Sequence, residues 1–220
     1  MNKKLGWMLC LMALAVCASS LPAMADTLYG NLGPPADLYQ AGVGWTITGT
    51  GALGFYQGIA EEFQVGFNGN VNEIDAGVGF VQGPNSFVMS LVEGSTPTGT
   101  VLGSWTLSSP QTFGGCCGLM SQTGLSIPVV TGQNYWLIVE PAGGLNSNTF
   151  GAWNLSNSTN GELNFSTDGG NTWNDGGVAS QGAFQVLGSA GGTTPEPSSL
   201  LLLGTGLVGA FGVVRRKLNR

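Results

Sequence analysis

Carboxylates are the first residues of this sequence whose types and spacing could support chemistry. Glu61 and Glu62 are adjacent in a predicted strand, so their side chains point to opposite faces of a sheet. Glu73 and Asp75 stand two residues apart and share a face. A glycoside hydrolase needs two carboxyl groups a few ångströms apart, one with a raised pKa, and this pair could supply them together with Glu61 or Glu93. The simpler interpretation, which we favour, is a solvated acidic sheet face without enzymatic activity.

A candidate cation site lies in the loop 168–177. Asp168, Asn171 and Asp175 supply hard oxygen ligands there, among glycines that permit tight turns. The loop lacks the spacing and the closing Glu of an EF-hand, so a plain Gly/Asn turn is the simpler interpretation. We expect no required cofactor or metal, and calcium is the one metal for which the chain has evident ligands.

The same loop carries Trp173, which we expect to be more exposed than Trp136 in its apolar run. Aromatic rings can stack on sugar faces, and Asn171 and Asn174 could hydrogen-bond to sugar hydroxyls. A carbohydrate-binding module, assisted by calcium or not, is therefore an alternative to a purely structural domain. An aromatic lid over one end of the fold is the simpler interpretation of Trp173.

Cys116 and Cys117 are the only thiols outside the N-terminal segment. A trans peptide holds neighbouring Cα atoms about 3.8 Å apart, short of the roughly 4.4–6.8 Å usual for a disulfide. Glycines at 114, 115 and 118 could absorb that distortion, and an exported protein meets oxidising conditions. The sequence favours a disulfide between the two neighbours that rigidifies the loop, with intermolecular bridges or a free thiol pair as alternatives. The spacing and the absence of a local cation argue against a redox catalyst.

The charges have an unusual distribution. All 6 Lys and Arg residues lie near the two ends of the chain, there is no His, and all 12 acidic residues except Glu196 lie within 26–193. Nucleic-acid binding needs cations that replace phosphate counterions, so we expect no nucleic-acid partner. Catalytic triads that use His, His metal sites and Schiff-base lysines are excluded from this region as well.

Short β-rich runs separated by Gly, Pro, Asn and Ser predict an all-β domain, a single β-sandwich resembling a jelly roll, over 26–187. We expect hairpin turns at Asn68-Gly69, at Asn160-Gly161 and at 168–170. The predicted strands are 44–48, 59–66, 71–81, 86–93, 101–107, 125–130, 135–140, 151–155, 163–166 and 183–187. A flexible Gly/Thr linker is predicted at 188–194.

Residues 1–25 have the pattern of a secretory signal peptide. A basic start and an apolar run precede Ala23-Met24-Ala25, a small-x-small site that leaves Asp26 as the new N-terminus. We therefore expect the Sec machinery and a signal peptidase as partners.

The C-terminal segment 195–220 has three parts in a fixed order. Pro195-Glu196-Pro197 comes first, an uncharged apolar run over 198–214 follows, and a basic end at 215–220 with Arg215, Arg216 and Lys217 closes it. The run is long enough for a short transmembrane helix, and the basic cluster favours the cytoplasmic side.

This three-part segment resembles the PEP-CTERM sorting signal of Gram-negative bacteria. The resemblance implies that an exosortase, an integral-membrane cysteine protease, cuts the chain at or near Pro195-Glu196-Pro197. It also implies export through an inner-membrane intermediate to the cell surface, outer envelope or extracellular matrix, often alongside exopolysaccharide production and biofilm. An ordinary C-terminal membrane anchor with a chance Pro-Glu-Pro is the alternative.

The domain itself resembles, more loosely, the secreted choice-of-anchor β-sandwich domains. The resemblance rests on Phe63 and Gly66, on the segments 90–99 and 135–137, on Trp153 and on the final 182–186. It implies a surface or matrix domain and names no ligand. Taken together, the sequence predicts an exported, exosortase-processed surface or matrix protein without enzymatic activity.

Overall fold

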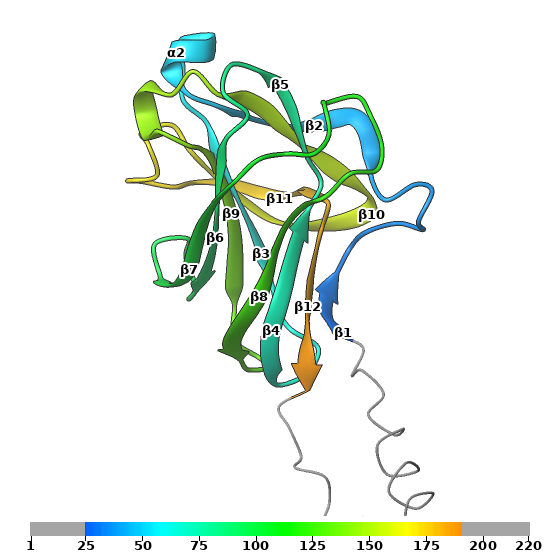
Figure 1. Ribbon diagram of the computed structural model, residues 1–220. Helices are drawn as coiled ribbons and strands as arrows, with labels where there is room; N and C mark the ends of the chain where they lie inside the picture. Colours follow the sequence, from blue (N-terminus) through cyan, green and yellow to red (C-terminus); the bar gives the residue numbers. More distant parts are fainter. Residues whose placement is uncertain (1–24, 191–220) are drawn as a thin grey trace, which may run out of the picture.

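The computed structural model describes residues 25–190, which form two packed antiparallel β-sheets (Figure 1). The expected all-β sandwich is confirmed. Its strands are β1 (Asp26–Gly30), β2 (Gln40–Thr48), β3 (Gly58–Phe63), β4 (Gly69–Ala76), β5 (Val78–Gln82), β6 (Phe87–Glu93), β7 (Thr100–Leu107), β8 (Met120–Val129), β9 (Tyr135–Pro141), β10 (Phe150–Ser166), β11 (Asn174–Gly182) and β12 (Phe184–Ala190). The short helix α2 (Thr50–Leu53) and the 3-10 turn η1 (Gly144–Asn146) lie together at one end.

The smaller sheet has four strands in the order β1-β12-β4-β8. The larger sheet runs β11-β10-β3-β9-β6-β7, and β2 and β5 pair with the two sides of the first part of β10. Edge strands β7 and β8 are consecutive in the chain and belong to different sheets, so the segment between them crosses the sandwich.

The strand β9 shows why the central strands form. Tyr135, Leu137 and Val139 point into the core, while Trp136 and Ile138 alternate onto the outer face, and all five are buried. A strand buried on both faces has a continuous run of apolar residues, and for this reason the sequence predicts β9 accurately.

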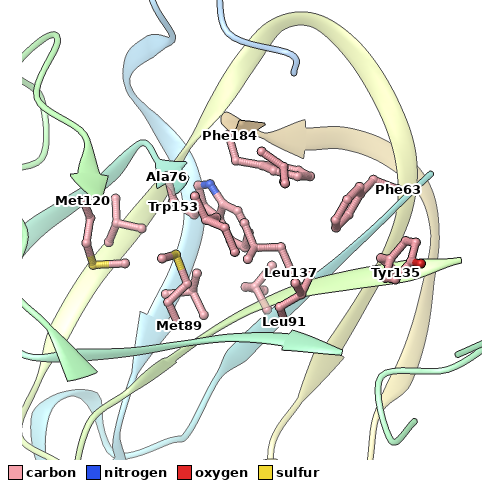
Figure 2. Packing of buried hydrophobic residues seen from close by; sticks show 14 of the residues in the cluster. Phe63, Ala76, Met89, Leu91, Met120, Tyr135, Leu137, Trp153 and Phe184 are labelled. Atoms are coloured by element: carbon pink, nitrogen blue, oxygen red, sulfur yellow. The ribbon is translucent and has the colours of Figure 1, made fainter. Parts of the chain in front are cut away.

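The core between the sheets is rich in aromatic rings (Figure 2). Trp153 lies among Phe184, Leu137 and Met89, and its indole N–H donates to the carbonyl of Ala183 at 3.0 Å. The ring of Phe184 contacts that of Trp153 with the centroids 5.8 Å apart. This indole is wholly buried with its polar atom satisfied, as a core Trp requires.

The prediction of one strand over 71–81 is wrong, because Gly77 divides it into β4 and β5, which belong to different sheets. The carbonyl of Gly77 accepts hydrogen bonds from the backbone N–H and the side-chain amide of Asn154, at 2.9 and 2.7 Å. A Cβ at this position would lie 2.9 Å from the ring of Tyr39. The chain can change sheets here because only glycine permits this close approach.

The turn expected at Asn160-Gly161 is also wrong, because both residues lie inside β10. β10 merges the predicted strands 151–155 and 163–166, and a register break between Leu155 and Asn160 against β11 replaces the turn. The strands β1 and β11 were not predicted. β11 is rich in glycine and polar residues and carries little strand signal of its own.

The two ends of the domain lie side by side. Asp26 of β1 is opposite Gly188 of β12, and we call this part of the sandwich the terminal end; α2 and η1 mark the opposite end, the α2 end (Figure 1). β12 continues to Ala190, so the first three residues of the predicted linker belong to the sheet. Within residues 25–190 no helix is long and apolar enough to cross a membrane.

Candidate functional site

Most residues predicted to take part in processing lie outside the described part of the chain: Ala23, Pro195, Glu196, Pro197, Arg215, Arg216 and Lys217. The predicted signal cleavage site borders the domain directly. Ala25 is exposed and Asp26 is the first residue of β1. A cut between these two residues would leave the whole sandwich intact.

The carboxylates of Glu73 and Asp75 lie on the outer face of the smaller sheet, since their neighbours Ile74 and Ala76 point into the core. Asp75 is almost fully buried, and its two oxygens accept hydrogen bonds from Ser121 on β8 and from the amide of Gln185 on β12, the latter at 2.8 Å. Burial, and then the neighbouring Asp75, raise the pKa of Glu73. Asp75 therefore joins three strands of the sheet.

Glu61 points the other way, into the core from the larger sheet, with no exposed surface. Its Oε1 accepts a hydrogen bond from the backbone N–H of Gly182 at 2.9 Å, and its Oε2 has no partner within the described residues. Burial raises the pKa of Glu61 to about 8, while the Gly182 hydrogen bond lowers it. Glu61 is thus a neutral acid at neutral pH.

The arrangement required of a glycoside hydrolase is not assembled from these groups. Glu73 and Asp75 lie outside the smaller sheet, whereas Glu61 is enclosed between the sheets and Glu93 ends β6 in the larger sheet. The opposite orientation of Glu61 and Glu62 is confirmed, since Glu61 is enclosed and Glu62 is half-buried on the outer face.

The polar side chains of the loop 168–177, which was considered for calcium, form hydrogen bonds with nearby residues of the chain. The carboxylate of Asp168 accepts hydrogen bonds from the hydroxyl of Ser166 at 2.9 Å and from the N–H and hydroxyl of Thr172 at 2.9 and 2.6 Å. The Thr172 hydrogen bonds hold the pKa of Asp168 below its ordinary value. The amide of Asn171 donates to the carbonyl of Asp168, and Asp175 accepts from the N–H of Gly177.

These contacts define turns, with Gly169 and Gly170 at positive φ as the Gly/Asn interpretation predicts. Among residues 25–190 no three His, Cys, Asp or Glu side chains gather as metal ligands would. The loop geometry thus supports a turn.

Beside this loop the structure places a contact that the sequence did not indicate. The hydroxyl of Tyr56 donates to Oε1 of Glu140 at 2.7 Å, near the beginning of β3 and the end of β9. Burial raises the pKa values of both groups; the hydrogen bond to Glu140 raises that of Tyr56 further, and the same bond lowers that of Glu140. No sequence spacing links two residues so far apart in the chain.

Trp173 is half-buried whereas Trp136 is buried, so Trp173 is the more exposed of the two, as the sequence predicts. It packs on a second, small apolar cluster on the outer face of the larger sheet, formed by Ala60, Val92, Trp136 and Ile138. Asn171 and Asn174 are exposed; the amide of Asn171 donates to the loop carbonyl of Asp168, and that of Asn174 to the carbonyl of Phe165 in β10. Trp173 is thus a covering ring, but it covers part of the outer face of the larger sheet instead of the expected end of the fold.

Cys116 and Cys117 are joined as a disulfide in the segment between β7 and β8. This segment runs alongside β5. The N–H of Phe113 donates to the carbonyl of Phe80 at 2.8 Å, and the N–H of Phe80 donates to the carbonyl of Gln111 at 3.0 Å. Cys116 is exposed and Cys117 is half-buried. The pair therefore lies in a crossover loop tied to the larger sheet.

A hollow of about 280 Å³ opens beside β2, between β3, β10 and β11. Four apolar side chains line it, those of Trp45, Ile59, Leu163 and Phe165. Gln57, Thr167 and Gly176 complete the lining. We call this site the Trp45 hollow. No sequence pattern indicates it, because only long-range strand pairing brings Trp45 near Phe165.

Comparison with known proteins bears on the C-terminal segment. No curated protein matches the sequence. Residues 193–217 match the family model of the PEP-CTERM protein-sorting motif. The match covers the Pro-Glu-Pro, the apolar run and the basic cluster that the sequence analysis singled out. The chain therefore carries a PEP-CTERM sorting motif, which makes it an exported protein sorted by an exosortase at the membrane.

Proposed function

We propose that this protein is displayed at the cell surface or in the extracellular polysaccharide matrix of a Gram-negative bacterium, as a binding or structural component without enzymatic activity. The observation that carries the proposal is the sorting motif at 193–217, which begins three residues after β12 ends at Ala190. The polypeptide between domain and motif is too short to hold another domain.

The geometry of the domain supports this role. Asp26 and Gly188 lie opposite each other, so the signal-peptide junction and the sorting tail both adjoin the terminal end. An anchor at either end of the chain would therefore leave the α2 end facing away from the membrane (Figure 1). Such an arrangement suits a domain that presents one end to its surroundings.

The surface chemistry is consistent with a hydrated matrix. Residues 25–190 contain acidic side chains and no Lys, Arg or His, so the domain is uniformly negative. Net charge of one sign keeps a secreted protein soluble and separate from its copies and from other acidic surfaces. In this proposal the partners are the Sec machinery and signal peptidase during export and the exopolysaccharide afterwards, and no cofactor is needed.

The decisive experiment is intact mass spectrometry of the protein from native cells, with and without the exosortase gene. We expect a chain that starts at Asp26 and ends near Pro195–Pro197, and that is lost without the exosortase. A mass two hydrogens below that of the reduced chain would report the Cys116–Cys117 disulfide. A chain that still includes Arg220 in cells with the exosortase would contradict processing and favour a plain membrane anchor.

A matched pair of variants separates the motif from its linker. Replacing Pro195, Glu196 and Pro197 with alanine should abolish processing, while replacing Gly191 and Gly192, which precede the matched residues, should leave it intact. Deletion of 194–220 should release the protein from the sorting route. Unchanged localisation after that deletion would contradict the proposal.

A carbohydrate-binding module remains the second candidate, with or without calcium, and a glycoside hydrolase the third. The Trp45 hollow favours the second, because two aromatic side chains line one hollow there, whereas the ring of Trp173 packs on the outer apolar cluster. Glu73→Gln and Asp75→Asn test the third: a binding protein would keep its ligand affinity in both variants, whereas a hydrolase would lose turnover.

A further inference from the structure

The Trp45 hollow is built from side chains that the fold holds in place. Trp45 of β2 lies opposite Trp153 of β10, and its indole N–H donates to the carbonyl of Ser180 on β11 at 2.8 Å. The indole that lines the hollow therefore also connects β2 to β11. Phe165 lies opposite Ile59 in the pairing of β10 with β3, which fixes these two lining side chains next to each other.

The walls are partly exposed and the floor is not. Trp45 and Phe165 are half-buried rings that pack on the main core, whereas Ile59 and Leu163 are buried. Pockets for small molecules combine apolar and aromatic walls with a few polar groups that fix orientation. The amide of Gln57 and the hydroxyl of Thr167 are the polar side chains available here, and Thr167 is exposed.

Charge restricts what can occupy the hollow. Among the residues that line it there is no acidic or basic side chain. The rest of the domain over 25–190 offers no Lys, Arg or His that could attract an anion. A cation would find no carboxylate in the lining and an anion would meet a negative domain, so the occupant is uncharged.

Size restricts it further. The volume of about 280 Å³ lies just below the range of roughly 300–1,000 Å³ typical of pockets for drug-sized ligands. One six-membered ring with its substituents suits such a space, and an extended chain does not. A sugar ring presents an apolar C–H face that can stack on Trp45 or Phe165 and hydroxyls that can bond to Gln57 and Thr167.

The position of the hollow suits a ligand that approaches from outside the cell. Gln57 pairs with Thr48, two residues before α2, so the hollow adjoins the α2 end. Asp26 and Gly188, next to the predicted anchors, mark the other end. A polymer could therefore reach the hollow while the domain remains attached to a membrane or envelope.

We propose that the Trp45 hollow binds a single neutral pyranose unit of an extracellular polysaccharide. This inference rests on the proposed role in the matrix. It assigns sugar binding to the residues of the hollow, in place of the Trp173 loop: Trp45, Phe165, Gln57 and Thr167. Binding is non-covalent and involves no reaction.

The test is isothermal titration of the exported protein, purified as cells produce it, with three classes of probe. The first is a panel of neutral oligosaccharides, namely cellotetraose, laminaritetraose, mannotetraose and maltotetraose. The second is tetragalacturonate, an anionic oligosaccharide, and the third is N-phenyl-1-naphthylamine, an uncharged apolar dye. We expect at least one neutral oligosaccharide to bind with a submillimolar to millimolar Kd, and tetragalacturonate to bind at least tenfold more weakly.

Two variants locate the site. Thr167→Phe adds a ring at the exposed part of the lining and should weaken sugar binding at least tenfold. Thr123→Phe makes the same change at an exposed position of β8 on the other sheet and should leave binding unchanged. Trp45→Phe keeps a ring but removes the N–H that donates to Ser180, and should weaken binding while the domain remains folded.

Three outcomes would overturn the inference: no neutral sugar binds, whether or not the dye does; tetragalacturonate binds as tightly as the neutral sugars; or Thr167→Phe binds sugar as the unmodified protein does. None of them would bear on sorting, because the titration uses purified protein, whereas processing is read from intact mass in cells. A failure of sugar binding and a failure of exosortase processing are thus separate results.

Discussion

The carboxyl group of Glu61 accepts a hydrogen bond from the backbone N–H of Gly182, 2.9 Å away, inside the core of a domain that has no basic side chain. The contact joins β3 of the larger sheet to the end of β11. Tyr29 of β1 is the titratable group beside it: burial and then the Glu61 charge raise the pKa of Tyr29 to about 12. A deprotonated Glu61 would therefore be a buried charge without a counter-ion.

This position predicts that the domain loses stability as the pH rises. Below pH 4.5 both the folded and the unfolded chain carry the Glu61 proton; between 4.5 and about 8 only the folded chain keeps it, and the free energy of unfolding falls. Above about pH 8 the loss levels off. Each unit of pKa difference corresponds to about 1.4 kcal/mol, so the loss amounts to several kcal/mol.

Urea unfolding of Glu61→Gln at pH 5 to 9 measures this effect. Burial also raises the pKa values of Glu62, Glu73 and Glu140, so the informative quantity is the difference between the variant and the unmodified protein. We expect Glu61→Gln to be relatively more stable at pH 8 than at pH 5 by several kcal/mol. Asp37→Asn, in an exposed loop, is the control. Parallel pH profiles for the protein and Glu61→Gln would show that Glu61 does not keep its proton.

The pairing of β1 with β12 makes a second prediction. Leu28 of β1 is buried in the core, and its side chain lies beside Gly69 and Gly188, where a Cβ would contact it. Leu28→Ala should lower the free energy of unfolding by roughly 2–5 kcal/mol, because the cavity left there has glycine neighbours that cannot fill it. Thr27→Ala, exposed on the same strand, should change it little. Equal stability of the two variants in urea would mean that β1 is not docked.

A third prediction concerns the position where the chain changes sheets. Gly77→Ala would place a methyl group 2.9 Å from the ring of Tyr39 and 3.4 Å from the carbonyl of Ala183. Overpacking of this kind costs roughly 1–3 kcal/mol, measurable as a lower urea midpoint. Gly66→Ala is the matched control, since its nearest atom is the carbonyl oxygen of Leu28 at an ordinary 3.6 Å. A neutral Gly77→Ala would show that Tyr39 moves aside without cost.

Gly77 also shows how far sequence reasoning reaches in this fold. Alternation predicts that 71–81 is extended, and it is, but local pattern carries no signal for the switch from one sheet to the other. β9 was predicted nearly to its boundaries because both of its faces are buried. The polar β11 was missed because its conformation depends on pairing with β10, which no local property of its residues expresses.

The sequence likewise predicts one candidate site and not the other. The sorting motif is local, and short-range order in the sequence was enough to find it. The Trp45 hollow joins β2 to β10 and β11, residues more than a hundred positions apart, so no spacing could indicate it. The Gly and Asn neighbours of Trp173 predict that it is more exposed than Trp136, which is confirmed, but the apolar cluster that Trp173 covers comes from other strands and has no local signal.

Substitutions of Trp173 can therefore distinguish a role in stability from a role in binding. Trp173→Ala would uncover the outer cluster around Trp136 and Ile138 and should lower the free energy of unfolding by roughly 1–3 kcal/mol, less than the roughly 3–5 kcal/mol of a fully buried Trp. Trp173→Phe keeps a ring over the cluster and should recover most of that loss. The affinity for any neutral sugar that the protein binds should be the same in both variants, because Trp173 does not line the Trp45 hollow. If Trp173→Ala instead kept its stability and lost sugar binding, the ring would be a contact residue, and the loop 168–177 would be the binding site.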